Sequence, residues 1–209
     1  MSAYDKPDSW SLKAQKAGYP ARSVYKLEEI DGKFRLLTPP RGGNPRVLDL
    51  GAAPGSWSLY ILRHYPGAFL AAADLQALSR RYDGDRFDGP DFFFIQGDFT
   101  SPPVREELLR RGPYTAIVSD AAPATTGSRT VDVPRSLALA EEVLLYADQC
   151  LAPGGNLAVK VFQGPGAAEL LGRLRRDFTG VRAFKPAACR GDSFETYYIG
   201  LGKRSKVEV

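Results

Sequence analysis

The sequence alternates short apolar runs with segments of helical periodicity, and this alternation leaves few folds open to the chain. The apolar runs cover 46–50, 68–73, 92–96, 116–119, 157–162, 181–185 and 196–201. The helices that we expect between them cover about 56–64, 104–111, 134–151 and 167–178. Strands that alternate with helices indicate an α/β fold: a doubly wound, mostly parallel seven-stranded sheet with helices on both faces. Such sheets bind ligands beyond the carboxyl ends of their strands.

The length of 209 residues predicts one domain, residues 1–209. We expect residues 1–45 to form a basic helical segment, with one or two helices over 9–34. Residues 46–202 then form the ligand-binding core.

Two boundaries in this pattern carry sequence signals. Pro134 fits the first position of its helix, because proline is tolerated where no helical N–H is needed. Gly154 and Gly155 fit a stop for the same helix.

The side-chain inventory excludes several classes of protein. Cys150 and Cys189 lie 39 residues apart, and His64 is the one histidine in the sequence. This set has neither metal-site spacing nor a disulfide framework, so we expect no metal ion and a reducing compartment. The N-terminal residues lack the apolar core of a signal peptide, and no run approaches the length of a membrane span. We therefore expect a soluble cytoplasmic monomer that has no membrane partner.

Charge is distributed unevenly along the chain. Residues 1–46 carry nine Lys and Arg against five Asp and Glu, and residues 160–209 carry ten against five. Residues 47–159 carry nine against fourteen. Two basic ends on one face would suit a polyanion, and an acidic middle would suit a ligand with hydroxyls or an ammonium group. Solvated helix faces are the alternative explanation.

The first expected strand runs into a loop with the sequence Asp49-Leu-Gly-Ala-Ala-Pro-Gly-Ser-Trp-Ser58. Gly51 and Gly55 allow a tight turn and a close approach of the backbone to a ligand. The spacing is not the GxGxxG of dinucleotide-binding proteins, because a third glycine is missing and Pro54 removes an N–H from a phosphate cradle.

Aspartates follow the next three runs. Asp74 lies 23 residues after Gly51, where a carboxylate could accept both hydroxyls of a ribose. Asp98 and Asp120 follow the third and fourth runs. A single Asp after a strand is more often a helix cap or turn residue. Successive acids at one sheet edge, with no phosphate cradle, favour S-adenosylmethionine over NAD or ATP as the ligand.

Three further ionisable residues stand in or beside apolar runs. Lys160 lies inside the run 157–162, Lys26 lies in Val-Tyr-Lys-Leu, and Glu195 precedes the last run. A lysine among apolar neighbours either extends to solvent or pairs with an acid. We expect these residues to meet Asp120.

Five segments together resemble the FtsJ-like family of RNA 2′-O-methyltransferases. They are Arg22-Ser-Val-Tyr-Lys-Leu27, the loop from Asp49 to Ser58, Ser119-Asp-Ala-Ala-Pro123, Val159-Lys-Val-Phe-Gln-Gly164 and Ser193-Phe-Glu-Thr-Tyr197. The resemblance covers about Ser9 to Lys203 and is strongest to the bacterial members that act on large-subunit ribosomal RNA. It implies the Rossmann-like fold of class I S-adenosylmethionine-dependent methyltransferases.

The resemblance also implies roles for individual residues. The residues that it assigns to a catalytic tetrad are Lys26, Asp120, Lys160 and Glu195. The residues that it assigns to the S-adenosylmethionine pocket are Gly51, Gly55, Trp57, Asp74, Asp98 and Asp120. The methyl acceptor that it implies is a uridine in 23S ribosomal RNA. The departures from the family pattern are Ser56 for glycine, Ala124 for asparagine, Cys189 for serine, and a longer stretch from Asp74 to Asp98.

Methyl transfer to a hydroxyl needs in-line positioning and a base that removes the proton, and we expect Lys160 to be that base. An ordinary lysine titrates near pH 10.4, so a lysine base at neutrality has to be shifted by roughly three units. Burial and a neighbouring lysine favour such a shift, whereas Asp120 and Glu195 oppose it. We expect the acids to orient Lys160, and Lys26 to steer the ribose or a neighbouring phosphate.

The expected partner is large-subunit ribosomal RNA, free or in a ribosomal subunit, lying across the two basic ends. The residues that we expect to contact its phosphates are Lys13, Lys16, Arg22 and Arg190. The sequence shows no aromatic platform for single strands, so we expect recognition of folded RNA with the target nucleotide turned out of its stack.

Three alternatives stay open on the sequence. A nicotinamide-dependent dehydrogenase would keep the fold, although the third glycine is missing. A non-catalytic RNA-binding protein would keep the scaffold. A methyltransferase of transfer RNA or of a messenger cap would keep the chemistry and change the substrate.

Overall fold

The computed structural model describes residues 8–191 and 193–205; residues 1–7, 192 and 206–209, which belong to the expected domain and N-terminal segment, lie outside this description. The strands are β1 (Arg46–Leu50), β2 (Phe69–Asp74), β3 (Phe92–Gln96), β4 (Tyr114–Ser119), β5 (Leu151–Phe162), β6 (Phe178–Phe184) and β7 (Glu195–Lys203). The helices are α1 (Ser9–Lys16), α2 (Val24–Phe34), α3 (Ser56–His64), α4 (Pro102–Leu109), α5 (Arg129–Cys150) and α6 (Ala167–Asp177), with a short 3-10 helix η1 (Arg86–Asp88).

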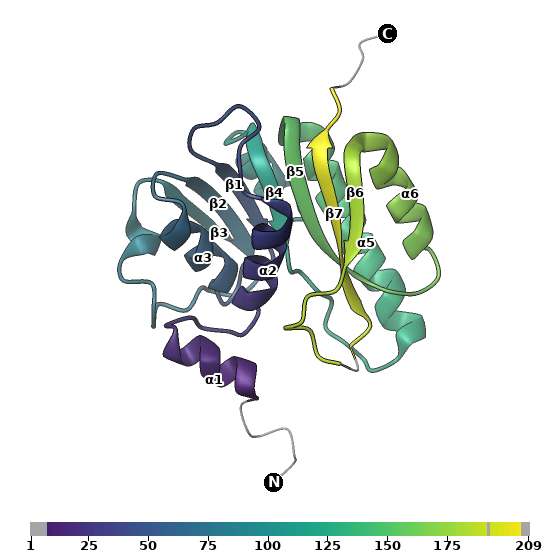
Figure 1. The fold of residues 1–209 in the computed structure, drawn as a ribbon, viewed down its shortest axis with the longest axis horizontal. Coiled ribbons are helices and arrows are strands. Elements are labelled where there is room, and N and C mark those ends of the chain that lie inside the picture. The colour runs from purple at the N-terminus through teal and green to yellow at the C-terminus, as the bar shows by residue number, and fades with distance from the viewer. Residues whose placement is uncertain (1–7, 192, 206–209) are drawn as a thin grey trace.

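Within the described residues the strands form a seven-stranded sheet in the order β3-β2-β1-β4-β5-β7-β6. β7 runs antiparallel to both of its neighbours, and the other neighbouring pairs are parallel (Figure 1). α1, α2 and α3 share a core with one face of the sheet, and α4, α5 and α6 share a core with the other. The predicted doubly wound, mostly parallel sheet is confirmed.

The central parallel strands end in register, and this places a row of residues along one edge. Leu50 of β1 pairs with Ala73 and Ser119 of its two neighbours, and Ser119 pairs in turn with Val159 of β5. The residues that follow these four are Gly51, Asp74, Asp120 and Lys160. The chain reverses its winding between β1 and β4, which is where ligands bind in such sheets.

Side chains alternate between the two faces of the sheet and so decide which helices each residue meets. On β4, Val118 belongs to the core under α1, α2 and α3, and Ile117 belongs to the opposite core. On β5, Ala158 belongs to the same core as Val118. Two residues further along each strand, Asp120 and Lys160 therefore lie toward the helices α1 to α3.

The expected start of α5 is wrong. α5 begins at Arg129, so Pro134 lies inside the helix rather than at its first position. The carboxylate of Asp132 accepts hydrogen bonds from the N–H groups of Thr126 (2.9 Å) and Gly127 (3.1 Å), which fixes a helix start ahead of the proline. A proline this close to the start of a helix removes one intrahelical hydrogen bond without ending the helix.

The helix ends within one residue of the expected 151, but the role of helix stop given to Gly154 and Gly155 is wrong. α5 ends at Cys150, β5 begins at Leu151, and both glycines lie inside that strand. Gly154 has a φ of +81°, and the β4–β5 pairing shifts register beside it. The glycines therefore allow an irregularity in the strand, at a backbone conformation that a residue with a side chain would adopt only under strain.

The two helices of the N-terminal segment belong to the core on one face of the sheet. Asp31 of α2 accepts hydrogen bonds from the hydroxyls of Tyr60 (3.2 Å) and Tyr65 (2.5 Å) and from the N–H of Leu37 (3.0 Å). Asp31 is 5% exposed, so these bonds join α2 to α3 inside the protein. Figure 1 shows α2 in front of the sheet and α1 beyond its lower edge.

Within residues 8–191 and 193–205, no helix has the length and apolar character to cross a membrane. The same residues contain no group of three or more His, Cys, Asp or Glu side chains suited to a metal ion. Cys150 and Cys189 are free and buried. His64 stacks on Tyr60 with the ring centroids 4.3 Å apart.

Candidate active site

Four ionisable side chains that are distant in the sequence meet at the carboxyl edge of the sheet. The Nζ of Lys160 lies 3.0 Å from Oδ1 of Asp120 and donates to the carbonyl oxygen of the same residue at 2.5 Å. The Nζ of Lys26 lies 3.0 Å from Oε1 of Glu195 and 3.8 Å from Oδ1 of Asp120. The structure thus brings the four predicted catalytic residues together, and we call them the tetrad.

The tetrad is largely withdrawn from water, with side chains 8% to 17% exposed. Burial works to lower the pKa of Lys26, but the charges of Asp120 and Glu195 outweigh it and raise that pKa. Burial works to raise the pKa of Asp120, but the charges of Lys160 and Lys26 outweigh it and lower that pKa. Lys26 and Asp120 are therefore held in their charged forms.

Tyr197, which the sequence analysis did not assign to the site, lies against the tetrad. It is fully buried on β7, two residues after Glu195. Its hydroxyl donates a hydrogen bond to Oδ1 of Asp120, and its ring centroid lies 5.8 Å from the Nζ of Lys26. Residues two apart on a strand share a face, so the alternation that starts at Glu195 was the signal for it.

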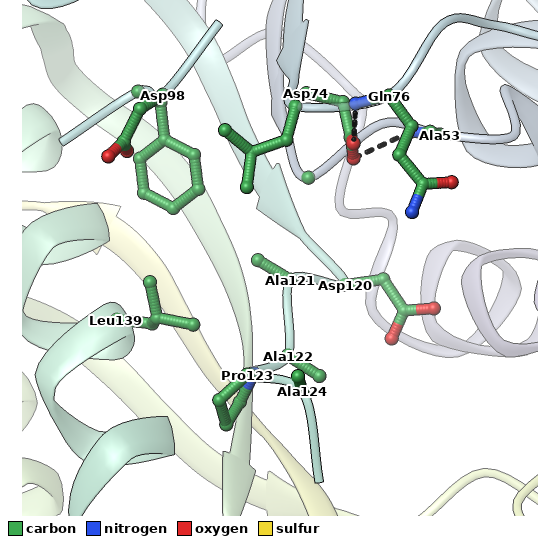
Figure 2. A pocket seen from close by; sticks show the side chains of 13 residues that line it. Ala53, Asp74, Gln76, Asp98, Asp120, Ala121, Ala122, Pro123, Ala124 and Leu139 are labelled. Carbon is green, nitrogen blue, oxygen red and sulfur yellow. Dashed lines mark hydrogen bonds between the residues drawn. The ribbon is translucent and has the colours of Figure 1, made fainter. Parts of the chain in front are cut away.

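A cavity of about 420 Å³ adjoins the tetrad where β1, β2 and β4 end (Figure 2). Its lining consists of Gly51, Ala53, Asp74, Leu75, Gln76, Asp98, Phe99, Asp120, Ala121, Ala122, Pro123, Ala124 and Leu139. Figure 2 shows Asp98 and Leu139 on one side of this cavity and Asp120 on the other. Asp120 therefore belongs both to the cavity and to the tetrad.

Gly51 gives the cavity its shape, because no larger residue fits there. Its φ is +79°, and a Cβ at this position would lie 2.6 Å from the Cβ and 2.7 Å from the Cα of Ala121. Gly55 has a φ of +104°, and a Cβ there would lie 3.0 Å from the ring of Phe87. Gly55 thus meets the segment between β2 and β3 and stands outside the cavity lining.

Trp57 also stands outside the lining. It is 2% exposed, its indole N–H donates to the carbonyl of Ser23 at 2.8 Å, and its ring packs 5.8 Å from that of Tyr197. Trp57 therefore joins α3 to the start of α2 behind the tetrad. Of the six residues that the resemblance assigns to the cofactor, the lining contains Gly51, Asp74, Asp98 and Asp120.

Asp74 and Asp98 of the cavity lining also order their own loops. Asp74 accepts hydrogen bonds from the N–H groups of Ala53 (2.9 Å) and Gln76 (2.8 Å), one on each carboxylate oxygen. Asp98 accepts two bonds from Thr100 on Oδ1, both of 2.8 Å. A carboxylate has about four acceptor sites, so each aspartate keeps sites for the hydroxyls or amino groups of a ligand.

The composition of the lining indicates which ligand the cavity suits. It contains three carboxylates, and the part of the chain that the structure describes contributes no lysine or arginine to it. Leu75, which is 70% exposed, adds an apolar surface beside Asp74. A nucleoside that carries a positive charge and no phosphate matches this set, as S-adenosylmethionine does, whereas a dinucleotide would bring phosphates to carboxylates.

A buried carboxyl group lies beneath the glycine loop. Asp49 is 1% exposed, and the hydroxyl of Ser58 donates to its Oδ2 at 2.7 Å. Its Oδ1 has no hydrogen-bond partner. Burial, with help from the charges of Asp120 and Asp74, raises the pKa of Asp49 to about 7. The acidic cavity therefore has a titratable group behind it.

The four residues expected to contact RNA differ in their solvent exposure and in their partners within the protein. Lys13 and Lys16 are exposed on α1, and the Nζ of Lys13 lies 4.3 Å from the ring centroid of Tyr25. Arg190 is exposed in the segment before β7. Arg22 forms an ion pair with Asp8 and donates to the carbonyl of residue 188 at 2.6 Å. Arg22 therefore holds the protein's own segments together.

Comparison with known protein families gives a match over most of the chain. The family described as FtsJ-like methyltransferase matches residues 19–203. A protein of Treponema denticola named ribosomal RNA large subunit methyltransferase E is 48% identical over 199 residues, which cover 95% of this chain and 96% of the relative. A protein of the same name from Nitratidesulfovibrio vulgaris is 44% identical and covers 94% of each chain.

Solved structures are similar as well. A crystal structure from Plasmodium falciparum, named a ribosomal RNA methyltransferase, has a TM-score of 0.71 and 26% identity and covers 90% of this chain and 100% of its own. Human methyltransferase-like protein 13, solved in complex with SAH, has a TM-score of 0.61 and 13% identity and covers 88% of this chain and 85% of its own. The second likeness concerns the fold alone.

Proposed function

Because this chain belongs to the FtsJ-like methyltransferase family, we propose that it transfers a methyl group from S-adenosylmethionine to the ribose 2′-hydroxyl of a uridine in 23S ribosomal RNA. The relatives that are 44% and 48% identical over nearly their whole length are named for the large ribosomal RNA, which supports this substrate over transfer RNA or a messenger cap. We place the reaction in the cytoplasm. We also propose that the protein acts as a monomer, since one chain supplies the whole tetrad.

One observation carries the proposal. The carboxylate of Asp120 lines the acidic cavity and at the same time contacts Lys160 at 3.0 Å and Lys26 at 3.8 Å. A methyl donor in the cavity and a hydroxyl beside the lysines would therefore meet across a single side chain. Holding two reactants in this way supplies much of the rate acceleration of a displacement.

The cavity residues would hold the cofactor, which when bound supplies a sulfonium methyl group. Asp74 would accept hydrogen bonds from the ribose hydroxyls, and Asp98 would accept a hydrogen bond from the amino group of the adenine ring. Leu75 and Leu139 would cover the faces of the ring, and Asp120 would lie toward the positive charge. The backbone of Gly51, which approaches Ala121 too closely for any side chain, would admit the ligand next to it.

The contacts of the two lysines assign them different tasks. Lys26 contacts two carboxylates, which raise its pKa, so it stays charged and attracts the ribose or an adjacent phosphate. Lys160 contacts one carboxylate and one carbonyl oxygen. We assign it the role of base: as the ribose oxygen bonds to the methyl carbon and the bond from that carbon to the donor sulfur breaks, the amine of Lys160 would take the proton of the 2′-hydroxyl. Asp120 would then stabilise the resulting ammonium.

The RNA would lie across the basic surface beside this edge. Lys13 and Lys16 on α1 and Arg190 before β7 are exposed, and Lys13 lies 4.3 Å from the ring of Tyr25 on the helix that carries Lys26, so we propose the three as phosphate contacts. Arg22 would act indirectly, through the segment that it holds.

The function is tested with large ribosomal subunits from cells that lack the modification. We expect the protein to transfer labelled methyl groups to one ribose of the large RNA, mapped by its resistance to alkaline cleavage. Lys160→Ala should abolish transfer and leave S-adenosylmethionine affinity within about two-fold, because Lys160 is absent from the cavity lining. Lys33→Ala, an exposed lysine on α2, is the control. Substantial turnover by Lys160→Ala would contradict the assigned base, and modification of another RNA would contradict the substrate.

A further inference from the structure

A second recess, of about 280 Å³, lies where the chain that follows β5 meets the start of α5. Its lining consists of Arg129, Thr130, Val133, Pro134, Gln163, Gly164 and Pro165. In contrast to the cofactor cavity, the described lining contains no carboxylate, and apart from Arg129 it carries no charge. At this size the recess suits one small flat group rather than a folded element.

The backbone connects this recess directly to the catalytic residues. Gln163 stands three residues after Lys160, and its N–H donates to the carbonyl of Phe194 at 2.9 Å. Phe194 immediately precedes Glu195. The segment that presents Lys160 therefore continues into the wall of the recess, and the segment that presents Glu195 is hydrogen-bonded to that wall. On the other side, the chain that follows Asp120 lines the cofactor cavity through residue 124 and reaches the recess at Arg129.

A rigid cationic plane borders the recess. The guanidinium of Arg129 lies 5.0 Å from the ring centroid of Phe194 and donates to the carbonyl of Gln163 at 3.2 Å. Phe194 is itself fixed, because its ring packs edge-on against Phe162 with the centroids 4.7 Å apart. Planar guanidinium and aromatic groups are surfaces on which unstacked nucleobases are held.

The floor of the recess is closed and largely apolar. A Cβ on Gly164 would lie 2.7 Å from Cγ1 of Val133, so β5 and α5 are in contact there without room for a further side chain. The side-chain Nε2 of Gln163 donates to the hydroxyl of Tyr198 at 3.2 Å, which fixes the side chain of Gln163. Thr130 is exposed at the rim. The recess thus combines a fixed cationic plane with a largely apolar floor.

We propose that this recess binds a nucleobase of the RNA strand that carries the target ribose, stacked against Arg129. The inference rests on the proposed function and extends it to the recognition of the substrate. The absence of carboxylates from the described lining distinguishes it from the cofactor cavity, and its wall begins three residues after Lys160, so an RNA strand whose ribose lies at the tetrad would have a neighbouring base within reach of it. A base held there fixes the ribose in the orientation that the displacement needs.

The test removes the plane or fills the recess. Arg129→Ala and Thr130→Trp should each raise KM for hypomethylated large subunits about 10-fold or more, since base stacking contributes at this level. S-adenosylmethionine affinity should stay within two-fold, which also shows that the variants are folded. The matched controls are Arg135→Ala, an exposed arginine on the same helix, and Val131→Trp, an exposed position next to Thr130 that is absent from the recess lining.

A direct readout complements the kinetics. RNA that carries 4-thiouridine at and around the target should crosslink to peptides that contain residues 129–134 or 163–165. A KM for Thr130→Trp equal to that of Val131→Trp, or crosslinks confined to α1, would overturn the recess and leave the methyltransferase function intact. Failure of the unaltered protein to methylate any large subunit would instead overturn the proposed function.

Discussion

Replacement of Gly51 by alanine should move the tetrad without touching any of its side chains. The new Cβ would lie 2.6 Å from the Cβ, 2.7 Å from the Cα and 2.9 Å from the N of Ala121, and two of these atoms belong to the backbone. Carbon atoms in contact prefer about 3.5–4.0 Å, so the chain next to Asp120 has to shift by roughly 1 Å. No rotation of a side chain can relieve the clash.

The structure gives a magnitude for the two consequences. A φ of +79° costs a residue with a Cβ about 1–2 kcal/mol, and the clash adds to this. For a chain of this length each kcal/mol lowers Tm by roughly 2–4 °C, so we expect Tm to fall by about 3–10 °C. A displacement of about 1 Å in a catalytic group can cost roughly 100-fold in rate, and we expect that loss in single-turnover methylation at saturating cofactor.

Gly42→Ala is the matched control for this experiment. Gly42 has a φ of +72°, close to that of Gly51, but a Cβ there would meet nothing within 4 Å. It therefore carries the backbone cost alone. Thermal unfolding and single-turnover rates of both variants should show a shared loss of stability and a loss of rate for Gly51→Ala only. If both variants methylate at the same rate, the reasoning that the close approach positions Asp120 is refuted.

Two further predictions concern protonation. Tyr197→Phe removes a hydrogen bond that helps to lower the pKa of Asp120, so an NMR titration of the Asp120 carboxyl group should show a higher pKa in the variant than in the unaltered protein; an unchanged titration would count against this contact. Asp49 has its pKa raised to about 7, above the value of about 3.9 in an unfolded chain, so the folded protein binds an extra proton between these values. The free energy of unfolding should therefore fall as pH rises from about 4 to about 7, and Asp49→Asn should flatten that decline in denaturant titrations; an unchanged slope would disprove it.

The sequence predicted the sheet and the convergence of the tetrad for one shared reason. Parallel strands end at one edge, and every second residue shares a face, so Asp120 and Lys160 lie together there. Glu195 joins them because it begins β7, which runs antiparallel to β5. Lys26 lies on a helix whose docking depends on tertiary packing, and its place in the tetrad followed from the family resemblance.

Features that depend on packing between elements could not be predicted in the same way. The direction of Trp57 is decided by how α3 lies against α2, and the positions of Gly55 and Phe87 depend on the fold of the segment after β2. The early start of α5 depends on Asp132, whose carboxylate accepts hydrogen bonds from the turn before the helix. The apolar periodicity of a helix gives no sign of these bonds. The recess beside Arg129 is lined by residues at the start of α5 and by residues that follow β5, and these two segments are distant in the sequence.

The three bonds that Asp31 accepts bear on how much of the protein is active at any moment. If α2 detached from the sheet, it would break the bonds from Tyr60 and Tyr65 and leave a buried core surface open to water. It would also carry Lys26 away from Glu195 and Asp120. Activity therefore requires that α2 be folded against the rest of the protein. A molecule in which α2 has detached is inactive even when its sheet is intact.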